Sequence, residues 1–417
     1  MSSEQQGNDV IDGYVSSPTI TPVTEEERFL SLDFIRGIAV FGILLMNVQV
    51  FGNVFASYVN PTVNDDFSGI NQVAWFFTHI FIEQKFYTIF SMLFGAGIVL
   101  MAERATLRGV SAGAYHYRRS ILLLIFGLCH GFFIWYGDIL TIYGFFALLV
   151  FGGWQSSPRR LIVVGIVLTL MVSLMMLAGS SEIDEDSVRE IERNFFPSLE
   201  MIEKEVAAYR GSWIDNQVER VEGMITMLSF LVFVGIRIAG CMLIGMALYK
   251  LGIINGKRST GFYRRLSAIC LVPGLIAIAY GANLIYQNEF KDAVKIQMLY
   301  GQINFLVSLP VALGYIGLFH LFHRSDCCAI LKKKFEAVGQ MAFTNYILQS
   351  VVCTSIFYGF GFGLFSSLER FEMLVVAVGV FLLQLFWSDW WLSRFRFGPI
   401  EWLWRSLVYF KLQRLRV

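Results

Sequence analysis

The sequence predicts an all-α polytopic membrane protein with about ten transmembrane helices. Hydrophobic residues make up 56% of the 417-residue chain and charged residues only 16%, whereas a soluble domain is nearer a quarter charged. Apolar runs of about 20 residues recur along the chain, and that length crosses the hydrocarbon core of a bilayer. The runs are continuous, whereas a transmembrane β-barrel shows short alternating segments.

The apolar runs define the expected elements in order. Ten spans are predicted, at 34–54, 85–102, 118–136, 139–154, 160–179, 225–249, 265–287, 300–320, 338–360 and 372–393. The aromatic stretch 71–84 predicts an interfacial helix that leads into the second span. Residues 1–29 are polar and lack the apolar core of a signal peptide, so they predict a disordered tail, with a capping box at Thr24–Glu27.

Basic residues fix the expected orientation. They concentrate after the second, fourth, sixth and eighth spans and in the C-terminal tail, whereas 180–224 holds 12 acidic and 5 basic residues. The positive-inside rule then places both termini in the cytoplasm. The expected organisation is a tail at 1–29, a five-helix half at 30–179, an extracytoplasmic loop at 180–224 and a second five-helix half at 225–417 with a basic cytoplasmic tail.

The long loop is expected to form two short helices. Its apolar residues have helical spacing, and Pro197 interrupts them. The sequence leaves open whether these helices form a lid or a solvated connector.

Composition excludes several classes of function. A net charge of +1 without a basic stripe argues against nucleic-acid binding. The six cysteines show no C-x-x-C spacing, which argues against a metal site. The chain also lacks a P-loop and a G-x-S-x-G turn. The expected partner is the lipid bilayer, and homo-oligomerisation is left open.

Arg36 and Asn47 lie on one face of the first span. Eleven residues make three turns and about 20°, so the two side chains are separated by roughly 16 Å along the axis. Asn47 has no water to bond within lipid and is expected to face the bundle. Alone, Arg36 fits a snorkelling anchor and Asn47 a clamp between helices.

His130 and Asp138 form the strongest candidate for chemistry. His130 lies deep in the third span, and Asp138 follows it after the break at Gly137. A carboxylate that binds an imidazole N–H orients the ring and raises its basicity, which suits a general base. N-capping of the fourth span by Asp138 is the structural alternative.

Other polar residues at membrane depth are weaker candidates, because such residues are costly and often functional. Lys85 opens the second span, Arg237 lies in the sixth, and Asn345 and Gln349 share a face of the ninth. His79 is an alternative catalytic histidine. Five glycines are expected only to permit close helix packing, namely Gly42, Gly95, Gly97, Gly127 and Gly131.

Five ordered motifs resemble the YeiB-like family of bacterial membrane proteins. They are SLDFIRGIAVFGILLMN, KFYTIFSMLFGAG, HGFFIWYGDIL, GQMAFTNYILQS and FGPIEWLWRSL, within residues 28–410. That family looks like a branch of the transmembrane acyltransferase superfamily, which includes heparan-glucosaminide N-acetyltransferase and bacterial polysaccharide O-acyltransferases. The O-acyltransferase branch has Arg-x10-His in its first span. Arg36 matches that arginine, but Asn47 replaces the histidine, as in the heparan-modifying branch, so the base must come from another helix.

The resemblance implies a membrane-embedded O- or N-acyltransferase of the bacterial inner membrane. It would transfer an acyl group from cytoplasmic acyl-CoA, in the first instance acetyl-CoA, to a small-molecule or glycan acceptor. Arg36 would bind the phosphate or pantetheine part of the donor, and Asn47 would stabilise the oxyanion. His130, oriented by Asp138, would deprotonate a hydroxyl or amine of an envelope glycan or lipid. Lys85, Asn345 and Gln349 would contact the acceptor. A transporter or export factor for a small polar or lipid-linked metabolite is the alternative, as is a scaffold in which these side chains only clamp helices.

Overall fold

The computed structural model describes residues 29–64, 66–180, 183–229 and 231–416. Residues 1–28 of the tail predicted at 1–29, with its capping box, therefore lie outside the described residues. The elements are α1 (Leu30–Gly52), α2 (Phe55–Val59), α3 (Gly69–Phe77), the π-helical turn η1 (Thr78–Ile82), α4 (Lys85–Leu107), α5 (Ala112–Phe133), α6 (Leu140–Val150), η2 (Phe151–Gly153), α7 (Pro158–Gly179), α8 (Glu185–Phe195), α9 (Leu199–Arg210), α10 (Gln217–Ser229), α11 (Leu231–Lys250), α12 (Thr260–Gln287), α13 (Ala293–Lys295), η3 (Ile296–Tyr300), α14 (Gly301–Arg324), α15 (Ala329–Gln340), α16 (Ala342–Phe357), α17 (Arg370–Leu392) and α18 (Pro399–Tyr409).

The described residues form an all-helical polytopic membrane protein, as predicted. Seven helical stretches within the described ranges are long and apolar enough to cross a bilayer, namely Leu30–Gly52, Gly69–Leu107, Pro158–Gly179, Leu231–Lys250, Thr260–Gln287, Ala293–Arg324 and Arg370–Leu392. They match seven of the ten expected spans. The other three fall on α5, which carries Arg118 and Arg119 near its start, and on the shorter apolar helices α6 and α16.

Local sequence sets where several helices begin. The hydroxyls of Ser111, Ser157, Ser198 and Ser259 accept backbone N–H groups in the first turns of α5, α7, α9 and α12, respectively. These N-caps satisfy donors that have no partner within the helix. Pro158 adds a preset φ at the first position of α7.

Two helix boundaries differ from the prediction. The span expected at 338–360 is interrupted, because α15 ends at Gln340 and α16 begins at Ala342. The Asn345 amide donates to the carbonyl of Val338 across this break (3.1 Å), so polar groups freed by the interruption are partnered. Of the span expected at 225–249, residues 225–229 belong to α10, and the described remainder belongs to α11.

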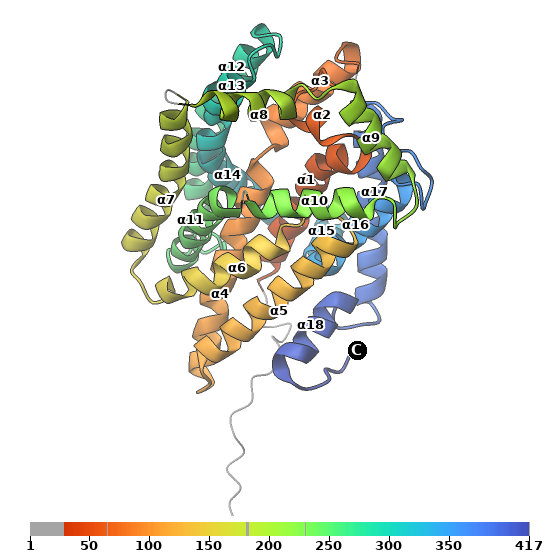
Figure 1. The fold of residues 1–417 in the computed structure, drawn as a ribbon. Helices are drawn as coiled ribbons and strands as arrows, with labels where there is room; N and C mark the ends of the chain where they lie inside the picture. Colours follow the sequence, from red (N-terminus) through yellow and green to blue (C-terminus); the bar gives the residue numbers. More distant parts are fainter. Residues whose placement is uncertain (1–28, 65, 181–182, 230, 417) are drawn as a thin grey trace, which may run out of the picture.

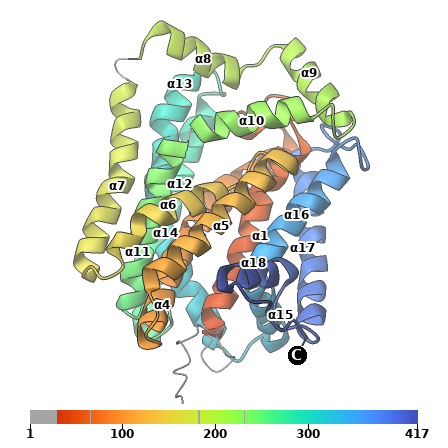
Figure 2. The ribbon, with the colours of Figure 1, turned by 60° about the horizontal axis from the view of Figure 1, so that its bottom comes forward.

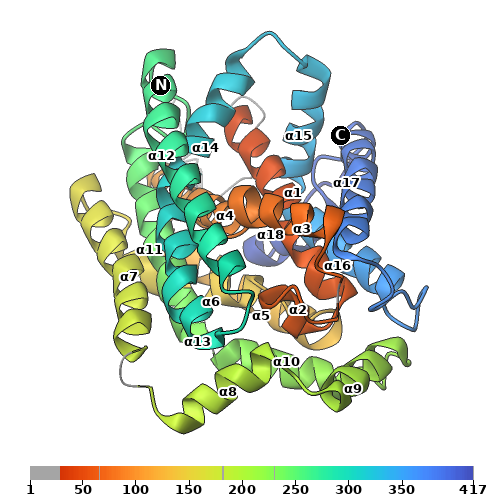
Figure 3. The same cartoon turned by 90° about the horizontal axis from the view of Figure 1, so that it is seen from above.

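The helices form two groups joined by α4. Figure 3 shows α7, α11, α12 and α14 on one side and α1, α15, α16 and α17 on the other. The helix α4 contacts α1, α11 and α14, and the hairpin of α5 and α6 contacts both α4 and α11. Helices from 30–179 and from 225–417 thus intermingle in one body, since α1 packs on α15–α17 and α7 packs on α11.

The basic segments meet at one end of the bundle. Lys250 donates to the carbonyl of Ser156 (2.8 Å), and Arg118 donates to that of Val408 (2.6 Å). Arg324 donates to the carbonyl of Arg258 (2.8 Å). These bonds join helix ends and loops that are far apart in sequence, near the lower end in Figure 1, where α18 lies.

The acidic helices α8 and α9 lie at the opposite end (Figure 1). As predicted, α8 and α9 are separated at Pro197. The Glu205 carboxylate accepts the N–H of Phe55 (3.0 Å), and Arg210 donates to the carbonyl of Phe365 (2.8 Å). The third helix, α10, crosses the bundle beside α5 and α6 (Figure 2). Its Gln217 donates to the carbonyl of Phe132 (3.1 Å), so α10 caps the C-terminal end of α5 instead of extending α11.

Candidate functional site

His130 and Asp138 form a closed pair inside the bundle. His130, near the end of α5, donates from Nδ1 to Asp138 Oδ1 at 2.8 Å, and both side chains are almost completely buried. The other carboxylate oxygen, Oδ2, accepts the backbone N–H and the hydroxyl of Thr141, each at 2.7 Å. Asp138 therefore fulfils both roles considered from sequence, because it orients the imidazole and caps the start of α6.

The second imidazole nitrogen of His130 is available for chemistry. His130 Nε2 is buried and has no hydrogen-bond partner among the described residues. Since Nδ1 donates to Asp138, Nε2 carries the lone pair in the neutral ring. A buried, oriented and unpartnered lone pair is what a general base requires before its substrate arrives.

Gly127 permits the close contact between α5 and α6 that forms this pair. A Cβ atom on Gly127 would lie 2.3 Å from the backbone nitrogen of Thr141 and 2.8 Å from Asp138 Oδ2. Any side chain there would force the start of α6 away from α5. The predicted packing role of this glycine is therefore also what lets Asp138 reach His130.

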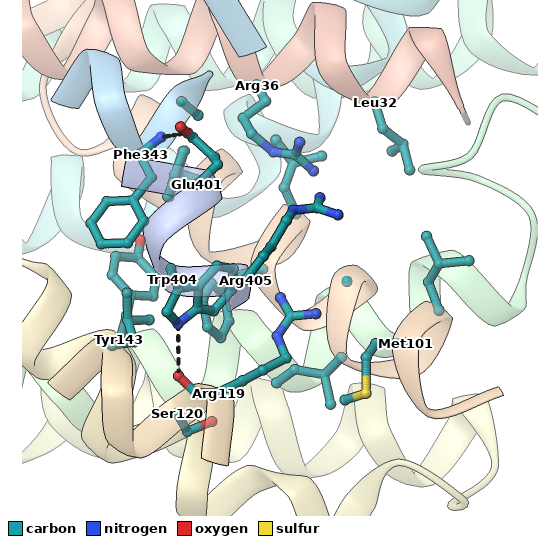
Figure 4. Close-up of a pocket in the computed structure, with 18 of the residues that line it drawn as sticks. Leu32, Arg36, Met101, Arg119, Ser120, Tyr143, Phe343, Glu401, Trp404 and Arg405 are labelled. Carbon is teal, nitrogen blue, oxygen red and sulfur yellow. Dashed lines mark hydrogen bonds between the residues drawn. The ribbon is translucent and has the colours of Figure 1, made fainter. Parts of the chain in front are cut away.

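A cavity of about 320 Å³ opens at the basic end of the bundle. Five arginines line it, from α1, α4, α5, α18 and the residue directly after α4, namely Arg36, Arg104, Arg119, Arg405 and Arg108. Asp33 and Glu401 are the acidic residues of the described lining. Figure 4 shows Arg36, Arg119 and Arg405 pointing into one space. A cluster of guanidinium groups in one wall suits a phosphate or another polyanion.

Two of these arginines, Arg36 and Arg119, have partners that hold their side chains at the rim of the cavity. Arg36 binds Asp33 (2.6 Å), one turn earlier in α1. The guanidinium of Arg119 lies 4.5 Å above the ring of Trp404, whose indole N–H donates to the Arg119 carbonyl (3.3 Å). These contacts attach α18 to α5 at the rim of the cavity.

Glu401 fixes α18 to the break between α15 and α16. Its carboxylate accepts the N–H groups of Phe343 (2.8 Å) and Thr344 (3.0 Å) at the start of α16. Burial raises the pKa of this carboxyl, while the hydrogen bonds from Thr344 and Phe343 oppose that shift. Glu401 thus acts as an N-cap supplied from a distant helix.

The inner end of the cavity lies next to the histidine pair. Ile139, Leu140 and Tyr346 line the cavity, and Ile139 directly follows Asp138 in the chain. The ring of Tyr346 lies 5.3 Å from that of His130, and the Tyr346 hydroxyl accepts the N–H of Ile139 (3.2 Å). One layer of side chains therefore separates the cavity from the pair.

One stripe of α1 runs from the cavity toward the surroundings of His130. Arg36, Val40 and Ile43 line the cavity, and Asn47 continues their helical spacing. One turn further, Phe51 stacks on Trp135 (3.9 Å between ring centroids), and Trp135 lies 6.4 Å from His130. The half-buried side chain of Asn47 makes no hydrogen bond to any other described residue.

Lys85 belongs to a different polar cluster, on the opposite side of α4. Its Nζ donates to Asn304 Oδ1 (2.6 Å) and to the carbonyl of His79 (2.7 Å). His79 Nδ1 pairs with Glu83 (2.6 Å). Neither Lys85 nor His79 is among the residues that line the cavity. Arg237, in the adjacent helix α11, donates to Gln84 (3.1 Å) and Ser308 (2.5 Å).

Asn345 and Gln349 lie in a network between α16 and α17. The Asn345 side-chain amide donates to Ser388 (2.9 Å), and the Asn345 backbone carbonyl accepts from Gln384 (2.8 Å). Gln349 donates to Gln384 Oε1 (2.9 Å). Neither residue lines the cavity. Their partners satisfy both side chains, and the predicted contact with an acceptor stays a prediction.

Sequence reasoning missed most of the cavity. It treated Arg104, Arg108 and Arg119 as markers of orientation and left out Glu401 and Tyr346. One signal was present, because Arg119 precedes His130 by eleven residues, the same interval as from Arg36 to Asn47. In the described ranges, no group of three or more His, Cys, Asp or Glu side chains has the arrangement of a metal site.

The fold and the site define a helical membrane protein in which a buried histidine–aspartate pair lies behind an arginine-lined cavity. The chain belongs to the family described as Protein of unknown function (DUF418), whose model matches residues 248–411. It is 33% identical to the uncharacterized protein YeiB of Escherichia coli (strain K12) over 92% of this chain and 96% of that protein. It is 32% identical to the uncharacterized protein YxaH of Bacillus subtilis (strain 168) over 95% of this chain and 98% of that protein. No solved structure matches the chain.

Proposed function

We propose that this protein is a membrane-embedded acyltransferase that uses acyl-CoA from the cytoplasm. The observation that carries the proposal is the buried His130–Asp138 pair behind an arginine-lined cavity. His130 Nε2 has no partner among the described residues, and the His130 ring lies 5.3 Å from the ring of Tyr346, which lines the cavity. The cavity suits a polyanionic donor, and the pair suits removal of a proton from an acceptor.

The transfer step follows from this geometry. His130 Nε2 takes the proton of an acceptor hydroxyl or amine, and the acceptor atom attacks the thioester carbonyl. The C–S bond then breaks, and the CoA sulfur leaves with the proton held by His130. Asp138 stabilises the imidazolium, and the amide of Asn47 donates to the oxyanion. Arg36 binds phosphate groups of the donor at the cavity rim.

The orientation that fits this reaction has both termini in the cytoplasm of the bacterial inner membrane. The arginine-lined cavity lies at the end where the basic segments meet, and the positive-inside rule places that end inside. Ten crossings result if α5, α6 and α16 are added to the seven long apolar stretches. Reporter fusions after Leu107 and within 185–220 test the orientation, and cytoplasmic signal from 185–220 would overturn it.

The proposed reaction is tested by comparing cells with and without the gene. Mass spectrometry of envelope glycans and lipids should find one acyl substituent that disappears on deletion and returns with the wild-type gene. The His130→Gln gene should not restore it, whereas His320→Gln should. His320 is a matched control, because it is also buried in an apolar helix but binds the carbonyl of Ile254 (3.1 Å) away from the cavity. Unchanged envelope composition across a full set of growth conditions would contradict acyl transfer.

A further inference from the structure

The cavity has open space directly in front of Gly97. This residue lies in the middle of α4 and lines the cavity, yet a Cβ atom built on it would meet no described atom within 4 Å. Gly95, two residues earlier, is different, because its Cβ would lie 1.9 Å from the carbonyl oxygen of Met242. Helix packing explains Gly95. It does not explain Gly97, contrary to the role predicted from sequence.

A glycine inside a helix is destabilising relative to alanine by roughly 0.5–1 kcal/mol, so its presence needs a reason. Gly97 keeps space free in front of the helix at the level where the cavity passes. The residues seven before and seven after it lie on nearly the same face, because seven residues turn a helix through about 700°. They are Phe90 and Arg104, and both line the cavity.

The face of α4 that lines the cavity is therefore basic at one end, open in the middle and aromatic at the other end. Arg104 lies at its basic end, Gly97 leaves it open about 10 Å further in, and Phe90 lies about 10 Å beyond that. Opposite, Leu123, Leu140 and Tyr143 supply apolar walls from α5 and α6. A space of this kind matches a ligand in which a linear apolar chain is attached to an anionic group.

We infer that the cavity binds an amphiphile that has a phosphate-bearing head at the arginines and a linear apolar chain along Gly97. This inference deepens the proposed function, and it rests on that function only where the amphiphile is an acyl-CoA. If the amphiphile is the acyl-CoA donor, its acyl chain is longer than an acetyl group. A single-chain lipid phosphate has the same chemistry, and the test below separates the two sources.

The test measures binding of a ligand series to the full-length protein in phosphatidylcholine nanodiscs, with empty nanodiscs subtracted. The ligands are CoA, acetyl-CoA, octanoyl-CoA and octyl phosphate. Burial of one methylene strengthens binding roughly fourfold. Octanoyl-CoA should therefore bind at least about tenfold more tightly than acetyl-CoA, even if only two of its additional methylenes are buried.

Gly97→Leu places a side chain in the open space in front of α4, so this variant tests the inference most directly. It should remove most of the preference for octanoyl-CoA while it leaves the affinity for CoA unchanged. Gly379→Leu is the matched control, because Gly379 is also a mid-helix glycine with open space before it, in α17 outside the cavity. The control should keep the wild-type preference.

The outcomes test the long-chain inference and the proposed acyl-CoA donor separately. Tight octanoyl-CoA binding that Gly97→Leu alone weakens supports both. Binding of octyl phosphate that Gly97→Leu weakens, without binding of any CoA compound, supports the inference and contradicts the acyl-CoA donor. Equal affinity for acetyl-CoA and octanoyl-CoA overturns the long-chain inference and leaves acetyl transfer standing. Equal losses in Gly97→Leu and Gly379→Leu, or no binding of any ligand, also overturn the inference.

Discussion

Asp138 holds His130 and the start of α6 with different oxygens of one carboxylate. Oδ1 accepts from His130 Nδ1 at 2.8 Å, and Oδ2 accepts from the backbone and hydroxyl of Thr141 at 2.7 Å. Removal of this carboxylate therefore affects chemistry and stability together, and a suitable test has to separate the two effects.

Asp138→Asn is expected to separate them. The amide oxygen of asparagine can still accept from Thr141, so the cap should lose less than about 1 kcal/mol of stability. The amide no longer stabilises an imidazolium, so acyl transfer should fall about 10²–10⁴-fold. Thermal unfolding and transfer rate per folded molecule are the measurements. A rate close to wild type would show that Asp138 is only a helix cap.

The two neighbouring glycines of α4 should respond oppositely to alanine. Gly97→Ala should raise the free energy of unfolding by roughly 0.5–1 kcal/mol, because the methyl group meets open space and the helix gains propensity. Gly95→Ala should lower it by about 1–3 kcal/mol, since its methyl group would collide with the Met242 carbonyl. Thermal unfolding in one detergent checks both. A destabilised Gly97→Ala protein would mean that neighbouring side chains occupy the space in front of Gly97.

Arg36 is expected to contribute to donor affinity, not to folding. Arg36→Ala should weaken CoA binding by roughly 10-fold or more, the loss of one charge-assisted contact. Arg36→Lys should restore only part of it, because an ammonium lacks the planar fork. Arg159→Ala, an exposed arginine outside the cavity at the same end of the molecule, is the control. Unchanged CoA affinity in folded Arg36→Ala would leave Arg36 as a membrane anchor.

The protein should lose stability as pH rises from about 4.5 to about 7, because of Glu205 at its acidic end. Burial, with a smaller repulsion from Glu219, raises the pKa of Glu205 to about 7, although the bond from the Phe55 N–H opposes this. The folded carboxyl therefore binds a proton that the unfolded carboxyl releases near pH 4.5. The contribution of the protonated Glu205 carboxyl to the free energy of unfolding is fully present below about pH 4.5. It is lost as pH rises to about 7.

Melting temperature across pH 4.5–8 measures this effect. Glu205→Gln should flatten the decline, because its amide does not ionise. The difference should stay below about 3 kcal/mol, since the side chain of Glu205 is half-buried and solvent screens part of the effect. Identical pH profiles for the wild type and Glu205→Gln would contradict this account of the loop.

The histidine pair was predictable because it is local. His130 and Asp138 are eight residues apart across one tight break, so sequence spacing alone brings them near each other. Hydropathy likewise located the seven long apolar stretches, since length and composition decide them.

The cavity was not predictable in the same way. Its arginines come from helices separated by up to 369 positions, from Arg36 to Arg405, and only tertiary packing gathers them. The break before α16 was also hidden, because its cap, Glu401, comes from α18. The position of α10 depends on Gln217 and the exposed carbonyls of α5, which hydropathy cannot detect.

The most direct test of the account compares His130→Gln with His320→Gln in purified, nanodisc-embedded protein, using the acceptor found by envelope mass spectrometry. The account predicts that His130→Gln lowers the rate of acyl transfer per folded molecule by at least about 100-fold. Its donor affinity and melting temperature should stay close to those of wild type and of His320→Gln. Near-normal transfer by folded His130→Gln would contradict the account, as would a loss of transfer that only follows a loss of folded protein.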